Sequence, residues 1–287
     1  MIAATTMNMT TLIDLITSPL AYEFMQRGMI AAVLVGIVCA VVGSYVVLRG
    51  MAFFGDALAH TILPGIALGY LITGGARDGL FWWALGTAVV AALGIGAISK
   101  NAEIKEDTSI GIIFAGMFAL GIALISTVKS YAVDLTHFLF GNVLSVSSQS
   151  LWLILIFSGL VLLTVFAFYK EFMTLSFDPI LAATLRLPVG ALNNLLLTLI
   201  AVTVAVSLQT VGVALMVAML VTPAATAYLL THRLSTMMLL AALFASLSGV
   251  IGLYLSFYLS IASGAAIVLT ATAFFILAFG WKKIRQK

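Results

Sequence analysis

The chain has 287 residues, of which 63% are hydrophobic and only 8% are charged, and its net charge is +3. Because soluble domains carry about 25% charged residues, this composition excludes a soluble globular protein and predicts a polytopic protein of the lipid bilayer. The positive charge does not indicate a nucleic-acid partner, since the basic residues lie in short segments between apolar runs, where they set membrane orientation.

The apolar runs are about 20 residues long, which is the length that a helix needs to cross the hydrocarbon core. Backbone groups must be satisfied inside lipid, so runs of this length predict helices and not barrel strands. We expect an all-α, polytopic helical bundle with eight or nine transmembrane helices. The number stays open because the junctions at 208–212 and 258–263 have no charged break, so each is a tight turn or a break within a span. The expected spans are roughly 29–48, 52–73, 80–99, 109–128, 150–169, 191–209, 211–230, 235–258 and 260–281.

The chain divides into three parts by composition. Residues 1–28 are mixed and predict an amphipathic or interfacial segment. Residues 29–281 form a single transmembrane domain, and residues 282–287 form a basic tail. Lys and Arg concentrate on the cytoplasmic side of membrane proteins, which predicts a cytoplasmic C-terminus. Nine crossings then leave only three of the 13 basic residues outside, namely Arg27, Arg77 and Lys129.

The second expected span contains the sequence RGMAFFGDALAHTILPGIALGY, residues 49–70, with an Asp–His pair inside a long apolar run. Asp56 and His60 are four residues apart, so on a helix they share one face, with Cβ atoms about 5–6 Å apart. Ionisable groups at membrane depth are expensive and usually line a functional path. Pro64 has no N–H, so the carbonyl of His60 would lose its helical partner there. One helical turn therefore offers a carboxylate, an imidazole and a carbonyl oxygen as cation ligands.

Two other interpretations of this span stay open. Asp56 and His60 could pair with each other and pin helices together without binding an ion. Gly55, Gly65 and Gly69 are expected to let helices approach closely, although Gly55 could also be a hinge.

Asp and His ligands suit manganese, iron and zinc alike, so the sequence does not choose among them. The only cysteine, Cys39, lies in an apolar run and behaves as a small hydrophobe, which argues against a copper(I) path.

Residues 101–109, NAEIKEDTS, form a short charged connector that we expect to be a solvated loop. Thr108 or Ser109 is expected to cap the helix that follows.

Residues 170–190, KEFMTLSFDPILAATLRLPVG, form a second unusual connection, called the coupling segment below. Asp178 followed by Pro179 is typical of an N-cap and the first helical position. Pro188 and Gly190 are expected to end this helix after about two turns. Such a helix is too short to span the membrane, so it is either a structural surface helix or a docking site for a soluble partner.

Three further features have weaker signals. Asp134 and His137 lie in the segment 129–149, predicted to be outside, and are expected to be ordinary loop residues or contacts for an incoming cation or its carrier. His232 is expected to be a solvated cap after a span. Pro223 frees the carbonyl of Met219 and indicates a kink, or a broken helix lining a path.

No enzyme motif is present. The chain has no G-x-x-x-x-G-K-[ST] sequence for binding ATP by a P-loop, and no zinc-protease or serine-hydrolase motif. We therefore expect no enzymatic activity.

Three stretches together resemble the permease subunits of bacterial metal-ion ABC importers of the manganese/zinc/iron class, the ABC-3 family. They are VVLRGMAFFGDALAHTILPGIALGYL around the Asp–His pair, SFDPILAATLRLPVG in the coupling segment, and VGVALMVAMLVTPAATAYLLTHRL at 211–234.

This resemblance implies a homodimer in the bacterial cell membrane that pairs with two cytoplasmic ATP-binding cassette subunits and receives metal from an extracytoplasmic metal-binding protein. It implies that Asp56 and His60 coordinate the transported metal, with Pro64 and Pro223 kinking helices near the pathway. No tightly bound cofactor is implied, only the transported divalent ion, manganese first and then zinc or iron. It places contacts to the ATPase on a helix at about Asp178–Leu187, at Asp178, Pro179, Ala182, Ala183 and Leu187.

Two hypotheses follow. In the first, the chain is the permease of an ATP-driven importer of divalent metal. In the second, it is a proton- or ion-coupled secondary carrier that works alone, with Asp56 and His60 as a proton relay. The coupling segment separates them, because a lone carrier needs no docking helix.

Overall fold

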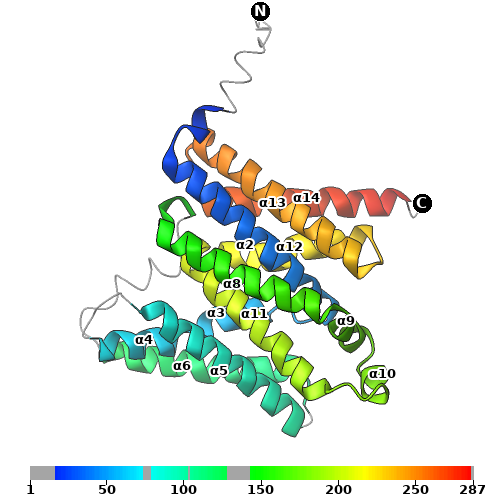
Figure 1. Ribbon diagram of the computed structural model, residues 1–287. Coiled ribbons are helices and arrows are strands. Elements are labelled where there is room, and N and C mark those ends of the chain that lie inside the picture. Colours follow the sequence, from blue (N-terminus) through cyan, green and yellow to red (C-terminus); the bar gives the residue numbers. More distant parts are fainter. Residues whose placement is uncertain (1–16, 74–78, 103, 128–142, 286–287) are drawn as a thin grey trace, which may run out of the picture.

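A computed structural model describes residues 17–73, 79–102, 104–127 and 143–285, and within these ranges the regular structure is entirely helical. Figure 1 shows the helices gathered into one bundle, with α9 and α10 at one end of it. Nine spans in the described ranges are long and apolar enough to cross a membrane, when α3 and α4 are taken as one. The all-α fold class is thus confirmed, with the larger of the two expected span numbers. The helices are α2 (Glu23–Leu48), α3 (Phe54–Thr61), α4 (Leu63–Ile72), α5 (Leu80–Asn101), α6 (Glu106–Ser126), the 3-10 turn η1 (Val143–Ser145), α8 (Ser148–Ala167), α9 (Tyr169–Phe177), α10 (Pro179–Thr184), α11 (Val189–Val211), α12 (Val213–Leu230), α13 (Leu234–Leu259) and α14 (Ser263–Arg285).

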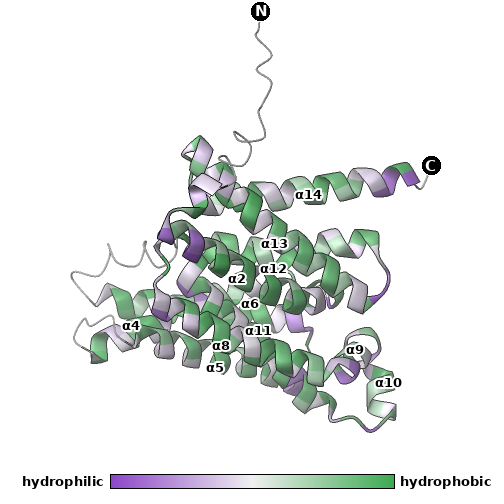
Figure 2. Ribbon diagram, turned by 45° about the horizontal axis from the view of Figure 1, so that its top comes forward, coloured by the Kyte–Doolittle hydropathy of each residue, from purple (hydrophilic) through white to green (hydrophobic). Residues whose placement is uncertain are grey.

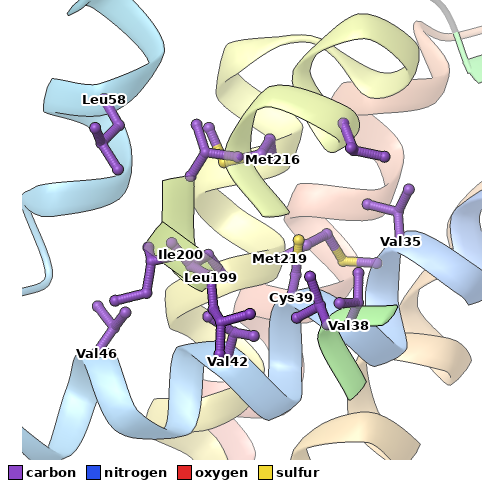
Figure 3. Packing of buried hydrophobic residues seen from close by; sticks show 14 of the residues in the cluster. Val35, Val38, Cys39, Val42, Val46, Leu58, Leu199, Ile200, Met216 and Met219 are labelled. Atoms are coloured by element: carbon purple, nitrogen blue, oxygen red, sulfur yellow. The ribbon is translucent and has the colours of Figure 1, made fainter. Parts of the chain in front are cut away.

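Helix α2 is the centre of the bundle. It packs against α8, α11, α12 and α13, and 72% of its most apolar window is buried. Close approach depends on Gly43, where an added Cβ would overlap the carbonyl oxygen of Leu220 on α12. Figure 3 shows Val38 and Cys39 of α2 pointing toward Met219 of α12 in the buried core. The small Gly43 on α2 therefore lets α12 approach closely.

Hydrophobic residues run along the lengths of the helices, and polar ones gather at helix ends and connections (Figure 2). The most exposed spans are α6 and α8, with 17% and 22% of their apolar windows buried. Their apolar surfaces face lipid or another chain, because exposing apolar surface of that extent to water is unfavourable.

The helix limits differ from expectation at both ends of the chain. Helix α2 begins at Glu23 and not at 29, because Glu23 favours the first turn of a helix and forms an ion pair with Arg27. The basic tail is not separate from the last span, since α14 continues to Arg285, whose guanidinium lies 6.0 Å from the ring centroid of Trp281. Residues 1–16 of the expected interfacial segment lie outside the described ranges.

The two uncertain junctions are both breaks between helices. Gly212 alone separates α11 from α12, with a φ of 79° that favours glycine. Ser260 ends α13 with a φ of 54°, and Ser256 Oγ donates a hydrogen bond of 2.7 Å to the Ile261 carbonyl beside it. Each junction thus divides two spans, as the nine-span alternative requires.

Pro64 and Pro223, the two prolines within spans, affect their helices differently. The second span is divided at Ile62 between α3 and α4, and Pro64 lies in the first turn of α4. A proline is tolerated there because N–H groups of the first turn have no acceptor within the helix. The N–H directed at the His60 carbonyl is that of Ile62, only two residues on, so the helical partner four residues on is missing at Pro64, as expected. Helix α12 continues through Pro223, so the expectation of a broken helix there is wrong.

The charged connector is shorter than expected. Helix α6 begins at Glu106, with Lys105 in the N-cap position, so Thr108 and Ser109 lie inside the helix and cap nothing. Ser109 Oγ instead donates to the Lys105 carbonyl at 3.4 Å. The helix starts early because Glu106 suits the positive N-terminal end and is held there by Arg49 of α2.

Candidate functional site

The Asp–His pair lies on α3, one turn apart as predicted. Asp56 Oδ1 and His60 Nε2 are 3.8 Å apart, and their side chains are 37% and 28% exposed. Protein oxygen and nitrogen ligands bind zinc at about 2.0–2.2 Å, so the two atoms would subtend an angle of about 120–145° at an ion bound to both. The two side chains are therefore spaced to share one divalent ion.

The alternative role of the pair, in which Asp56 and His60 pair with each other and pin helices together, stays a prediction, because 3.8 Å is within ion-pair range. Both side chains belong to the same helix, and the 3.8 Å separation exceeds a hydrogen bond. Within the described residues, neither side chain makes a hydrogen bond to another helix.

Two phenylalanines of α6 fix the imidazole of His60. The ring centroids of Phe114 and Phe118 lie 5.9 and 5.5 Å from that of His60, both edge to face. The two phenyl rings stack on each other at 5.7 Å, and Phe53 meets Phe114 edge to face from the start of α3. This packing leaves Nδ1 buried without a hydrogen-bond partner, while Nε2 faces Asp56. The sequence did not point to these aromatic contacts, since phenylalanine is common throughout the chain.

The predicted close approaches of helices at the three glycines are confirmed. A Cβ on Gly55 would lie 2.5 Å from Leu220 Cδ2 of α12. A Cβ on Gly65 would lie 2.5 Å from the carbonyl oxygen of Trp83 on α5, and one on Gly69 would lie 2.6 Å from the indole of the same residue. The broken span is thus held tightly against α5 and α12, which fixes where Asp56 and His60 stand.

The described part of the chain holds no group of three or more His, Cys, Asp and Glu side chains that could hold a metal ion. Cys39 is fully buried in α2, where its Sγ lies 3.4 Å from Ser207 Oγ. Within these residues, no third His, Cys, Asp or Glu side chain therefore lies beside the pair on α3.

The start of the coupling segment is as predicted. Asp178 is the N-cap of α10, and its Oδ1 accepts hydrogen bonds from the N–H groups of Ile180 at 3.0 Å and Leu181 at 2.9 Å. Pro179 is the first helical residue. The structure adds α9, which directly precedes Asp178 and was not expected from the sequence.

The end of this helix differs from the prediction, because α10 stops at Thr184 and not at Leu187. Arg186 takes a left-handed conformation with a φ of 58°. Its N–H donates to the carbonyl of Ala183, and the N–H of Leu187 donates to that of Ala182, at 3.0 and 3.1 Å. This is the Schellman arrangement that closes a helix, here with arginine in place of glycine.

Side chains of the coupling segment separate into two faces. Ala182 is fully buried and faces the bundle, whereas Ala183 is exposed and Leu187 is partly buried. The exposed face of the segment is apolar, and its large side chains are Phe177, Ile180, Leu181 and Leu185, which are 57%, 80%, 47% and 58% exposed.

The remaining candidates are His232, Asp134 and His137. His232 is exposed in the connection between α12 and α13, as expected of a solvated residue, and Arg233 N–H donates to Thr231 Oγ1 at 3.3 Å. Asp134 and His137 lie outside the described residues.

One polar cluster was missed by sequence reasoning. Arg49, at the end of α2, donates hydrogen bonds to Glu106 on α6 and to Asn193 on α11. The only sequence signal was an acidic residue in a connector and an asparagine in an apolar run, and neither shows that the three side chains meet.

Comparison with known proteins decides the family. Residues 21–282 match the ABC 3 transport family. The chain belongs to this family. The resemblance to permease subunits of metal-ion ABC importers is thereby confirmed, and so is the multi-pass membrane location that the nine apolar helices indicate.

Curated members of the ABC 3 transport family match almost the whole chain. The manganese transport system membrane protein MntC of Listeria innocua is 48% identical over 258 residues, covering 90% of this chain and 90% of that protein. The chelated iron transport system membrane protein YfeD of Yersinia pestis is 38% identical, covering 97% of this chain and 92% of that protein.

A solved structure of PsaBC from Streptococcus pneumoniae in complex with Fab shares the fold of this ABC 3 family member. Its matching chain is 39% identical to this one, with a TM-score of 0.79. The match covers 93% of this chain and 95% of that chain.

Proposed function

We propose that this chain is the permease subunit of an ATP-driven importer of divalent transition metal, with manganese as the first candidate. The Asp56–His60 pair carries the proposal, because it places a carboxylate and an imidazole within reach of one ion, on a helix held in a membrane bundle. Manganese ranks first because the MntC proteins are 46–48% identical to this chain, against 38% for the iron protein YfeD.

A second copy of the chain completes the site. Two ligands bind a divalent ion weakly, whereas a two-fold axis near α3 supplies two carboxylates and two imidazoles. Such N and O ligands accept manganese, iron and zinc, so much of the selection falls to the extracytoplasmic protein that delivers the ion. Weak binding suits a transporter, because the ion must also leave.

The energy comes from cytoplasmic ATP-binding cassette subunits that dock on the coupling segment. The apolar exposed face of α10 supports this, because large apolar side chains such as Ile180, which is 80% exposed, are costly in water and typical of a docking surface. ATP binding and hydrolysis then rock the two permease copies against each other and release the metal to the cytoplasm.

The ligands must be deprotonated to bind metal, with Asp56 ionised and His60 neutral. Uptake is therefore expected to weaken as the pH falls, because protons compete with the ion for both side chains.

The proposal is tested by uptake into proteoliposomes that contain the chain together with its ATPase subunit. Manganese, zinc and iron are supplied in competition, with the binding protein outside, and with ATP or a proton gradient as the energy source. ATP-dependent uptake of one metal supports the importer and names its cargo. Uptake that ignores ATP and follows the proton gradient would establish the secondary carrier instead.

A further inference from the structure

Arg49, Glu106 and Asn193 form a closed triangle of hydrogen bonds, called the polar triad below. Arg49 Nη2 donates to both carboxylate oxygens of Glu106, at 2.8 and 2.9 Å, and to Asn193 Oδ1 at 2.6 Å. Asn193 Nδ2 closes the triangle with a bond of 2.9 Å to Glu106 Oε1. Each member thus touches the other two, so a shift of one side chain disturbs both remaining contacts.

The triad links the end of α2, the start of α6 and the start of α11, which are neighbours of α3 and of the coupling segment. Arg49 is the C-cap of α2 and precedes α3, which carries Asp56. Glu106 begins α6, the helix whose phenylalanines pack on His60. Asn193 lies in the first turns of α11, which starts at Val189, at the end of the coupling segment. One cluster therefore connects the segment before α3, the helix that packs on His60 and the helix that follows α10.

A second contact ties the same end of α2 to the coupling segment. Tyr45, one turn before Arg49, is fully buried, and its ring packs edge to face on Phe172 of α9 with centroids 5.8 Å apart. The end of α2 is thus held by α9 on one side and by α6 and α11 on the other.

The triad is expected to add little to the net stability of the fold. The side chains of Arg49 and Glu106 are only 13% and 23% exposed, and Arg49 Nη1 is buried without a partner. Burial lowers the pKa of the Arg49 guanidinium, and the facing Glu106 carboxylate opposes that shift. Partly buried ion pairs often add little net stability, because desolvation offsets the attraction, but they fix the register of the elements that they join.

We propose that Arg49, Glu106 and Asn193 are positioning residues that transmit movement of the coupling segment to the metal pair on α3. This inference rests on the proposed function. The triad sets the joint between α2 and α3 and the place of α6, so the ATPase can open or close the metal site only while the triad is intact.

The test uses the full chain with its ATPase subunit in proteoliposomes, and measures manganese uptake and ATP hydrolysis on the same preparation. Glu106→Gln removes the charge of the ion pair, and Asn193→Leu removes the link to α11 while leaving the ion pair in place. Asp107→Asn is the matched control, because this neighbouring carboxylate is exposed.

If the triad transmits movement, Glu106→Gln and Asn193→Leu lower the manganese imported per ATP by about tenfold, a size typical of coupling between sites. The yield of complex and its ATPase rate stay near those of the wild type, and Asp107→Asn changes nothing. A purely structural triad gives parallel loss of complex, hydrolysis and uptake, which overturns the proposal, as does an unchanged ratio of manganese to ATP in both variants. Failure of the wild type itself to import with ATP overturns the proposed function, and the role of the triad with it.

Discussion

Asp178→Ala tests whether α10 must be a formed helix for the ATPase to dock. The helix has only six residues, and the Asp178 carboxylate accepts two of its first N–H groups, at 3.0 and 2.9 Å. Replacing an N-cap aspartate by alanine costs about 1 kcal/mol. On an exposed single-turn helix that loss lowers the ratio of formed to frayed helix about fivefold, since RT is about 0.6 kcal/mol.

The assay is the affinity of the detergent-solubilised permease for its purified ATPase subunit. Asp178→Asn is the matched control, because asparagine caps helices as well as aspartate does but carries no charge. We expect weaker binding for the alanine variant, by at most about fivefold because the apparent affinity scales with the fraction of formed helix, and near wild-type binding for the asparagine variant. Equal weakening in both variants would show that the charge matters and not the cap, and equal wild-type affinity would refute docking on α10.

Three further predictions concern the bundle and the site. Gly43→Ala should destabilise the protein by about 1–3 kcal/mol, because the added Cβ overpacks against Leu220. The control Gly111→Ala should be neutral, because nothing lies within 4 Å of the added Cβ, and equal melting temperatures of the two variants would contradict the packing. Cys39 is fully buried, so a maleimide should label it only after denaturation, and rapid labelling of the folded protein would place it on a path. Asp56→Ala should abolish metal uptake but leave assembly with the ATPase intact, and loss of assembly in that variant would favour a structural role.

The features that sequence reasoning predicted well depend on local chemistry. Apolar runs of the length of the bilayer gave the spans, because lipid leaves a helix few alternatives. Asp178 and Pro179 gave the start of α10, because an N-cap and its following proline act over two or three residues. Pro64 indicated a kink in the second span, and the structure divides that span into α3 and α4 just before it.

The features that sequence reasoning missed depend on residues far apart in the chain or on unusual backbone conformations. The end of α10 was placed too late because Arg186, a residue without the freedom of glycine, takes the left-handed conformation. The start of α6 was misplaced because Glu106 is held by Arg49, which is distant in sequence. The aromatic contacts of His60 likewise come from Phe114 and Phe118 of α6, so only the packing of helices could reveal them.

The central claim is that the pair on α3 carries a divalent metal under the control of an ATPase. The most direct test is manganese uptake by the reconstituted complex, with and without ATP, for the wild type, His60→Ala and the control His232→Ala, whose histidine is exposed between α12 and α13. The account predicts ATP-dependent uptake in the wild type and in the control, and none in His60→Ala although its complex assembles. Uptake that persists without His60, or that proceeds equally without ATP, would contradict it.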